Sequence, residues 1–258
     1  MAEGSGVKTG DAVATGSDLG AMGTMHWSPE LQKARVYEQI LLDIILGELP
    51  PGGRLDEQAL VRRYDAGLAG VRDALGRLAL EGLVIRKARA GTTVAPLDII
   101  ELRQAFEART LIEPHCAALA ARHAGSEDLA NLAHAFDGAA EAIRNRDFRA
   151  LVAMDQRFHA SVARASRNVT LARIIIPLQH KAARFWIYSM DDDTEEERIE
   201  EINRHMAVAA CIAQGDAERA RTMMLEVLGT FSDNMRRAAM GIAGGAARPP
   251  GLVLSVPD

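Results

Sequence analysis

A long stretch at residues 98–239 constrains the fold most strongly, because apolar residues recur in it at helical spacing and only short loops interrupt the pattern. The helical periods cover 98–123, 126–145, 147–166, 169–190, 194–214 and 216–239. Strand signals are nearly absent, and aromatic residues make up only 4% of the chain, which favours close-packed helices. The stretch therefore predicts an antiparallel, all-α helical bundle.

A different pattern precedes Pro96. Helical segments separated by Gly-rich and Pro-rich breaks lead into two short β-rich pieces, "LVIR" and "TTVA", around the turn "KARAG". Asp56 is placed to cap the second of three helices. Three helices followed by a hairpin is the order of a winged helix-turn-helix. We expect this domain at 31–96 and the helical domain at 97–240, so the fold class is mainly α.

The two ends of the chain lack periodicity. Residues 1–30 are rich in Gly, Ala, Ser and Thr, and 241–258 are similar, so both are expected to be flexible tails. No signal peptide and no apolar run of about 20 residues is found. Cys116 and Cys211 lie in apolar helical patterns without a second cysteine at metal-ligand spacing. We expect buried free thiols in a cytoplasmic protein.

Charge is unevenly distributed along the chain. The formal net charge is −5, so the chain as a whole is not a polyanion binder. Residues 33–96 hold ten Lys/Arg against eight Asp/Glu, a net +2, which leaves −7 for the rest. This local excess permits contact with nucleic acid without establishing it.

Asp155 and His159 lie four residues apart in an amphipathic helical segment, so both side chains leave the same face. One carboxylate and one imidazole cannot hold a transition metal with useful affinity. The pair is therefore either a simple salt bridge or part of a metal site that takes further ligands from elsewhere in the chain.

Residues 33–239 resemble a known family in two consecutive parts. The first part resembles the DNA-binding domain of the GntR family of bacterial transcription regulators. Its matching positions are Pro51-Gly52, Leu55, Glu57, Leu60, Val71-Arg72-Asp73-Ala74-Leu75, Leu78, Glu81-Gly82-Leu83-Val84, Gly91 and Val94. The second part resembles the effector-binding (FCD) domain of the FadR-like branch, through "ARTLIEPHCAALAAR", "DQRFHASVARASRN" and "RHMAVAACIAQGDAERA".

The winged domain implies a set of DNA contacts. In a helix-turn-helix the second helix enters the major groove with its N-terminal residues at base edges. That helix starts near Gly70, which makes Arg72 the residue best placed to reach a guanine or a phosphate. Its alternative is a solvated surface arginine. The full set of predicted DNA-contact residues is Arg72, Arg62, Arg63, Arg86, Lys87, Arg89 and Gly91.

The winged domain also departs from the family pattern. Relatives carry a Ser-Arg-Thr-like run where this chain has Gly67-Leu68-Ala69, so a second base-reading arginine is missing. Gln58 stands where relatives often have arginine or another polar residue. We expect contacts to rest more on phosphates, and weakened sequence-specific DNA binding is an alternative.

The resemblance also implies a metal site. Asp155 and His159 match its Asp-x-x-x-His, and His205 stands at the position of a third ligand. The fourth ligand is expected at position 227, where this chain has Val227. Three ligands suit zinc, nickel or a similar divalent ion. The alternative is a buried Asp–His pair near His205 without metal.

Two further positions match the family. Arg109 corresponds to an arginine that faces the bundle cavity, where it could grip the carboxylate of a small acid. It could equally form an intrahelical pair with Glu113. Asn168 follows the Asp/His helix and is favoured as the cap of the next helix.

The leading functional prediction is a DNA-binding transcription regulator, not an enzyme. A small carboxylate would bind the helical domain and alter the affinity of a homodimer for a symmetric double-stranded operator. A ligand-binding or scaffold protein of the same fold is the alternative. A metal hydrolase is disfavoured, because no general base is recognisable beside the three ligands.

Overall fold

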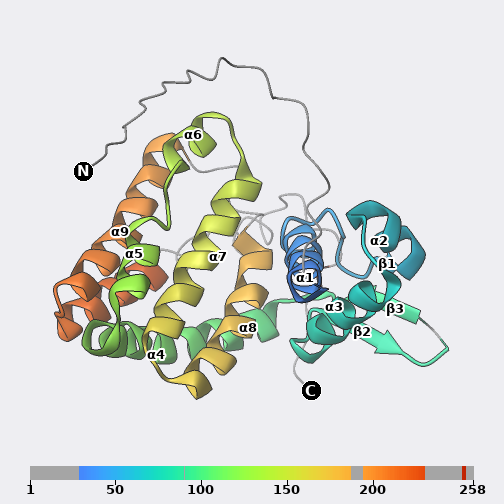
Figure 1. The fold of residues 1–258 in the computed structure, drawn as a ribbon, viewed down its shortest axis with the longest axis horizontal. Coiled ribbons are helices and arrows are strands. Elements are labelled where there is room, and N and C mark those ends of the chain that lie inside the picture. Colours follow the sequence, from blue (N-terminus) through green and yellow to red (C-terminus); the bar gives the residue numbers. More distant parts are fainter. Residues whose placement is uncertain (1–28, 90, 187–193, 230–251, 254–258) are drawn as a thin grey trace, which may run out of the picture.

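The computed structural model describes residues 29–89, 91–186, 194–229 and 252–253. A smaller head built from the N-terminal part of the chain lies beside a larger helical bundle (Figure 1). Most of the two predicted tails, residues 1–28, 241–251 and 254–258, lies outside the described residues. Within the residues described, no helix is both long enough and apolar enough to cross a bilayer.

The head has the predicted winged helix-turn-helix order. Its elements are α1 (Pro29–Ile45), β1 (Arg54–Leu55), α2 (Glu57–Tyr64), α3 (Leu68–Leu80), β2 (Val84–Lys87) and β3 (Gly91–Val94). The strands form one antiparallel sheet in the order β1-β3-β2. Asp56 caps α2 as predicted, because its carboxylate accepts from the backbone N–H of Ala59 at 2.7 Å.

The bundle follows the head without a long connection. Its helices are α4 (Ile99–His123), α5 (Ser126–Ala133), α6 (Ala139–Arg144), α7 (Phe148–Ala165), α8 (Val169–Trp186) and α9 (Glu195–Ala213), and residues 217–229 are helical too. The single helix predicted at 126–145 is wrong, since a break at 134–138 divides it into α5 and α6. Gly138 has a φ of 85° there, a backbone conformation that favours glycine and interrupts a helix.

Polar side chains fix where the bundle helices begin. Asp98 accepts from the N–H groups of Ile100 and Glu101 at the start of α4. Asn168 accepts from the N–H of Leu171 at 3.1 Å, so its predicted capping role at α8 is confirmed. A reciprocal capping box between Thr194 and Glu197 opens α9. Glu195, Glu196 and Glu197 lie in the first turn of α9, where negative charge is favourable.

One short pairing lies outside the expected pattern. β4 (Leu97–Asp98), directly before α4, pairs in parallel with β5 (Leu252–Val253). The second strand falls in the segment 241–258 that we expected to be a flexible tail, and the expectation is corrected at these two residues. Two residues carry too little periodicity for a strand to be recognised.

The head and the bundle share one apolar core. Ile40 of α1 and Leu75 of α3 belong to the same buried cluster as Val152 of α7 and Ala183 of α8. A second cluster inside the bundle surrounds Phe158, which is fully buried. Both cysteines are buried and free, as predicted. Apolar contact therefore continues from α7 and α8 into the head.

Candidate functional site

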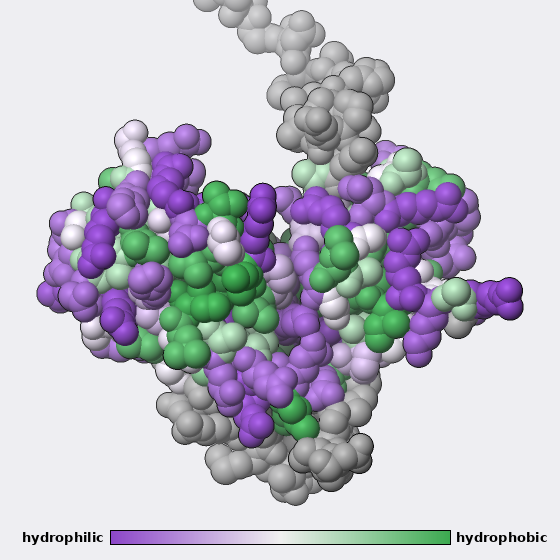
Figure 2. Space-filling view, turned by 90° about the horizontal axis from the view of Figure 1, so that it is seen from below, coloured by the Kyte–Doolittle hydropathy of each residue, from purple (hydrophilic) through white to green (hydrophobic). Residues whose placement is uncertain are grey.

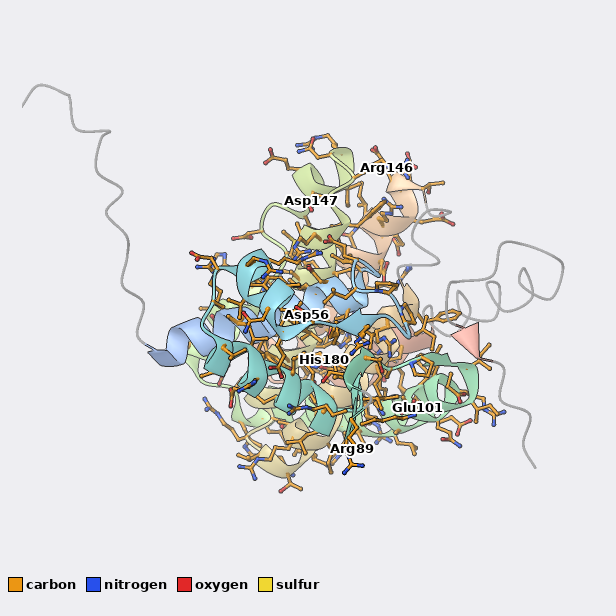
Figure 3. All side chains as sticks on the ribbon, turned by 90° about the vertical axis from the view of Figure 1, so that its right-hand side faces the viewer. Asp56, Arg89, Glu101, Arg146, Asp147 and His180 are labelled. Atoms are coloured by element: carbon orange, nitrogen blue, oxygen red, sulfur yellow. The ribbon has the colours of Figure 1, made fainter. Side chains whose placement is uncertain are left out.

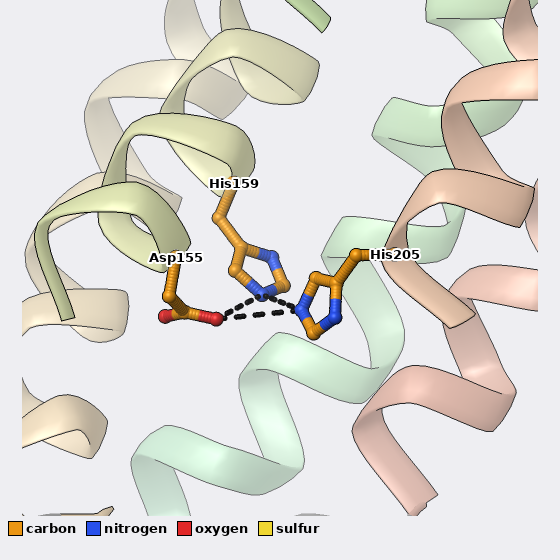
Figure 4. A group of neighbouring side chains, drawn as sticks. All are labelled: Asp155, His159 and His205. Carbon is orange, nitrogen blue, oxygen red and sulfur yellow. Dashed lines mark hydrogen bonds and ion pairs between the residues drawn. The ribbon is translucent and has the colours of Figure 1, made fainter. Parts of the chain in front are cut away.

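The structure brings Asp155, His159 and His205 together in the middle of the bundle (Figure 4). Asp155 and His159 lie one turn apart on α7, and His205 faces them from α9. The two Nε2 atoms lie 3.3 Å apart, and Asp155 Oδ1 lies 3.5 Å from His159 Nε2 and 3.3 Å from His205 Nε2. Two nitrogens and one oxygen thus converge on one point, although their residues are up to 50 positions apart in the sequence.

The Nδ1 atoms of His159 and His205 each have a hydrogen-bond partner, which indicates where each ring carries a proton. His159 Nδ1 lies 2.6 Å from Glu113 Oε2, and His205 Nδ1 lies 2.7 Å from the carbonyl oxygen of Glu201. Both partners are acceptors, so each Nδ1 donates a hydrogen, and a ring presents a lone pair at Nε2 when it is neutral. The two Nε2 atoms and the Asp155 carboxylate face one another, so either a proton on a ring nitrogen or a metal cation would stabilise the cluster.

Electrostatics favour positive charge at this point. Burial alone would lower the pKa of His159, but the charges of Glu113 and Asp155 outweigh it and raise that pKa to about 9. Burial likewise opposes ionisation of Asp155, yet the two histidines hold its pKa far below the usual range. The rings of Phe136 and Phe158 pack within 5.3 Å and 5.1 Å of the His205 ring centroid and form apolar walls.

The donor set fits a divalent metal. At zinc–nitrogen and zinc–oxygen distances of about 2.0–2.1 Å, tetrahedral ligands lie roughly 3.3–3.4 Å from one another. The three separations in the structure, 3.3, 3.3 and 3.5 Å, are close to this value. The Nδ1 contacts of both histidines are of the kind that fixes metal-ligating rings. Val227 lines the same cavity, so an apolar side chain stands at the position of the expected fourth ligand.

Arg109 also lines this cavity, and its intrahelical pair with Glu113 is present. Arg109 Nε donates to Glu113 Oε1 at 2.5 Å, and both residues are buried. Burial acts to raise the pKa of Glu113, but the charges of Arg109 and His159 together lower it to about 2. Glu113 therefore links the arginine to a metal-ligand candidate, a contact that the i,i+4 spacing alone did not predict.

The cavity between these residues is small. Its volume is about 20 Å³, room for one ion or one water molecule. It is lined by Arg109, Asp155, Gln156, His159, Ala183, Glu201, His205, Val227 and Leu228. An organic acid would therefore enter only if the surrounding helices moved apart.

The predicted DNA-contact residues lie on the head. Arg62, Lys87, Arg89 and Gly91 are exposed, and Arg89 is labelled at the periphery in Figure 3. The side chains of Arg72 and Arg86 are 58% and 46% exposed. Arg63 is placed differently, because its guanidinium lies 2.5 Å from both Asp43 and Glu48.

Two polar clusters at the head–bundle junction were not found from the sequence. In the first, Glu81 at the end of α3 accepts from Tyr37 at 2.6 Å and lies 2.8 Å from His180 Nδ1 on α8. In the second, Asp43 of α1 binds Arg149 of α7 at 2.6 Å. These partners are up to 106 residues apart, so no spacing rule connects them; His180 is labelled in Figure 3.

Helix α8 extends from the cavity to the head. Ala183 lines the cavity, while His180 contacts Glu81 and Arg184 donates to the carbonyl oxygen of Ala95 at 2.5 Å. Lys181, on the same helix, pairs with Glu101. One rigid helix therefore contacts both the cavity and the end of the predicted DNA-reading helix.

Comparison with known proteins agrees with this architecture. The family model for the FCD domain matches residues 104–230, and the model for bacterial regulatory proteins of the gntR family matches residues 32–94. The E. coli K12 transcriptional repressor GlaR is 27% identical over 216 residues, covering 80% of this chain and 96% of that protein. A probable D-xylose utilization operon repressor of Paenarthrobacter nicotinovorans is 30% identical over 142 residues, covering 54% of this chain but only 62% of that protein.

A solved structure supports the fold. The structure of E. coli McbR/YncC superimposes with a TM-score of 0.69 at 20% identity, covering 81% of this chain and 98% of that one. At this identity the match shows the fold alone. Because one model matches the head and the other matches the bundle, the chain belongs to the GntR family of bacterial DNA-binding transcription regulators, in the branch that carries an FCD domain.

Proposed function

We propose that this regulator holds a divalent metal, zinc or nickel, at Asp155, His159 and His205, and that a small carboxylate completes the metal shell. The observation that carries the proposal is the convergence of two Nε2 atoms and one carboxylate oxygen, with both Nδ1 atoms bonded to acceptors. A bound metal would supply positive charge there and an open position for a carboxylate oxygen. Arg109, on the cavity wall, would bind the rest of the acid.

Metal content tests this proposal directly. Elemental mass spectrometry of the purified protein is expected to find about one zinc or nickel per chain, lost in an Asp155→Ala/His159→Ala double variant. The matched control is His134→Ala/Asp137→Ala, which removes an exposed His–Asp pair at 2.8 Å and is expected to keep the metal. Circular dichroism verifies that both variants remain helical. A metal-free wild type after incubation with both ions would contradict the proposal.

We further propose that effector binding changes operator affinity through α8. Because the cavity has room for only one ion or water molecule, an organic acid must displace the surrounding helices, and α8 contacts the end of α3 through His180. Such coupling requires that the effector bind two conformations with different affinity. The two relatives described above are repressors by name, so repression is the direction we propose for this chain.

The coupling is tested by measuring DNA affinity with and without saturating zinc and acetate as a probe carboxylate. We expect the wild-type affinity to change and His180→Ala to reduce that change. His115→Ala, an exposed histidine on α4, is the control. An equal response in all three proteins would contradict the proposed role of His180.

The proposed regulator acts as a homodimer on a symmetric operator. A candidate contact surface is the apolar area that Figure 2 shows on the bundle, seen from the side of α4 and α8. Leu111 of α4 is 79% exposed, and Val169 and Ile174 of α8 are 63% and 47% exposed. Light scattering of the wild type and Leu111→Glu measures this directly, and an unchanged dimer would exclude Leu111 from the contact.

The alternative is a protein of the same fold with weakened sequence-specific DNA binding. One observation favours it: Gly67, Leu68 and Ala69, at the start of α3, have no side chain that can donate a hydrogen bond to DNA. A gel-shift with the DNA upstream of the protein's own gene distinguishes the two. Retardation that competitor DNA of unrelated sequence removes equally well would support the alternative.

A further inference from the structure

An acidic side chain lies among the predicted DNA-contact residues. Glu57, in the first turn of α2, accepts from Arg72 Nε of α3 through Oε2 at 2.7 Å. Its other oxygen, Oε1, lies 3.9 Å from Arg86 Nη2 on β2. Glu57 thus contacts residues from two further elements of the head. A carboxylate near a DNA-binding surface repels phosphates, so this position has an electrostatic cost that a purely phosphate-binding surface would avoid.

The contact with Glu57 uses only one of the three nitrogen atoms of the Arg72 guanidinium. The hydrogen bond occupies Nε, while the side chain remains 58% exposed. Within the part of the chain that the structure describes, its terminal amino groups have no hydrogen-bond partner. These two groups are the ones that donate side by side when arginine binds the O6 and N7 atoms of guanine.

The position of Glu57 is itself fixed by the start of α2. Glu57 is the first residue of α2, and the preceding Asp56 fixes the start of that helix through its bond to the Ala59 N–H. The Glu57 side chain is 25% exposed, less than half as much as that of Arg72. An arginine loses much rotamer freedom when it binds, and a fixed partner at Nε removes part of that loss before binding.

We propose that Glu57 is a positioning residue that sets base specificity through Arg72. It orients the guanidinium so that both terminal amino groups point together toward one guanine, and it disfavours rotamers in which Arg72 binds a phosphate. This proposal rests on the proposed DNA contact of Arg72 and adds a residue that does not itself touch DNA.

The test is selection from a random double-stranded DNA library, with the full-length protein and sequencing of bound DNA. The wild type is expected to enrich a motif with a guanine preference in each half-site. Glu57→Ala is expected to reduce that preference roughly tenfold at this position alone, since a bidentate arginine–guanine contact discriminates by about that factor or more. Glu57→Gln is expected to retain part of it, because its amide oxygen still accepts from Nε.

Three controls separate positioning from other roles. Asp73→Asn removes a negative charge from an exposed residue next to Arg72 and is expected to raise affinity for all sequences without changing the preference. Glu57→Ala in an Arg72→Ala background is expected to cause no further loss of preference. Ala and Gln remove the same charge from the first turn of α2, so both are expected to lower the melting temperature slightly while their base preferences differ.

The outcomes are distinguishable. If the wild type enriches no motif, the proposed sequence-specific DNA binding fails. If the wild type enriches a motif that Glu57→Ala retains unchanged, the inference about Glu57 is wrong. A further loss of preference in the double variant would also overturn it, as would equal losses of preference in the Ala and Gln variants, which would indicate a general effect of α2 stability.

Discussion

Replacement of Glu113 by glutamine tests the electrostatic design of the bundle centre. Glu113 binds Arg109 Nε at 2.5 Å and His159 Nδ1 at 2.6 Å, and all three residues are buried. The amide keeps the size of the carboxylate but removes its charge. The buried guanidinium of Arg109 then lacks this counter-charge, and the histidine ring loses its charged acceptor.

The structure gives the expected magnitude. Removal of one partner from a buried ion pair costs about 3–5 kcal/mol. In the metal-free protein the Glu113 pKa falls from its ordinary value of 4.5 to about 2 on folding, which corresponds to roughly 3 kcal/mol. Because the folded-state pKa is depressed, this contribution is present above pH 4.5 and is lost as the pH falls toward 2. We therefore expect a destabilisation of roughly 3 kcal/mol at neutral pH.

The same helix supplies a matched control. Arg103 and Glu107 form an i,i+4 pair like Arg109 and Glu113, but both side chains are 67% exposed and the closest distance is 3.7 Å. We expect Glu107→Gln to cost under about 1 kcal/mol. Urea denaturation with a chelator present, followed by circular dichroism, measures both variants. If the two costs agree within about 1 kcal/mol, burial does not strengthen the Glu113 contacts and the reasoning is refuted.

Three further changes have defined outcomes. Val227→His places an imidazole on the cavity wall beside the ligand cluster and is expected to raise zinc affinity at least about tenfold. Competition with a chromogenic chelator measures this affinity, and an unchanged value would mean that position 227 does not face the ion. Gly67→Ser adds a side chain that can cap α3, and no other atom lies within 4 Å of the added Cβ. It is expected to stabilise the head by a few tenths of a kcal/mol in thermal denaturation, and a lower melting temperature would show that the cap does not form. Burial raises the pKa of Glu81, but hydrogen bonds from His180 and Tyr37 outweigh it and hold the pKa below 4.5. Glu81→Gln is therefore expected to lower the melting temperature at pH 7 and to lose this effect as the pH falls below 4.5. A difference in melting temperature between variant and wild type that stays constant with pH would contradict the lowered pKa of Glu81.

Local patterns were sufficient for the order of the elements. The spacing of apolar residues predicted the helices of the head and most of the bundle, because amphipathic periodicity reflects which face of a helix is buried. The exception was the predicted helix 126–145, where Gly138 adopts a positive φ. The pairing of β4 with Leu252–Val253 also gave no signal, since two-residue strands are too short for a period.

The candidate metal site was likewise predicted in part from the sequence and completed by the structure. The sequence by itself determined the fold class and placed Asp155, His159 and His205 as ligand candidates, because side chains four apart on one helix share a face and the family motif supplied the third. Only the tertiary structure decided what surrounds them. Glu113 approaches His159 from α4, and Glu57 meets Arg72 across 15 residues. Such contacts depend on how rigid elements pack in three dimensions, and packing is a property of the whole core rather than of any local spacing.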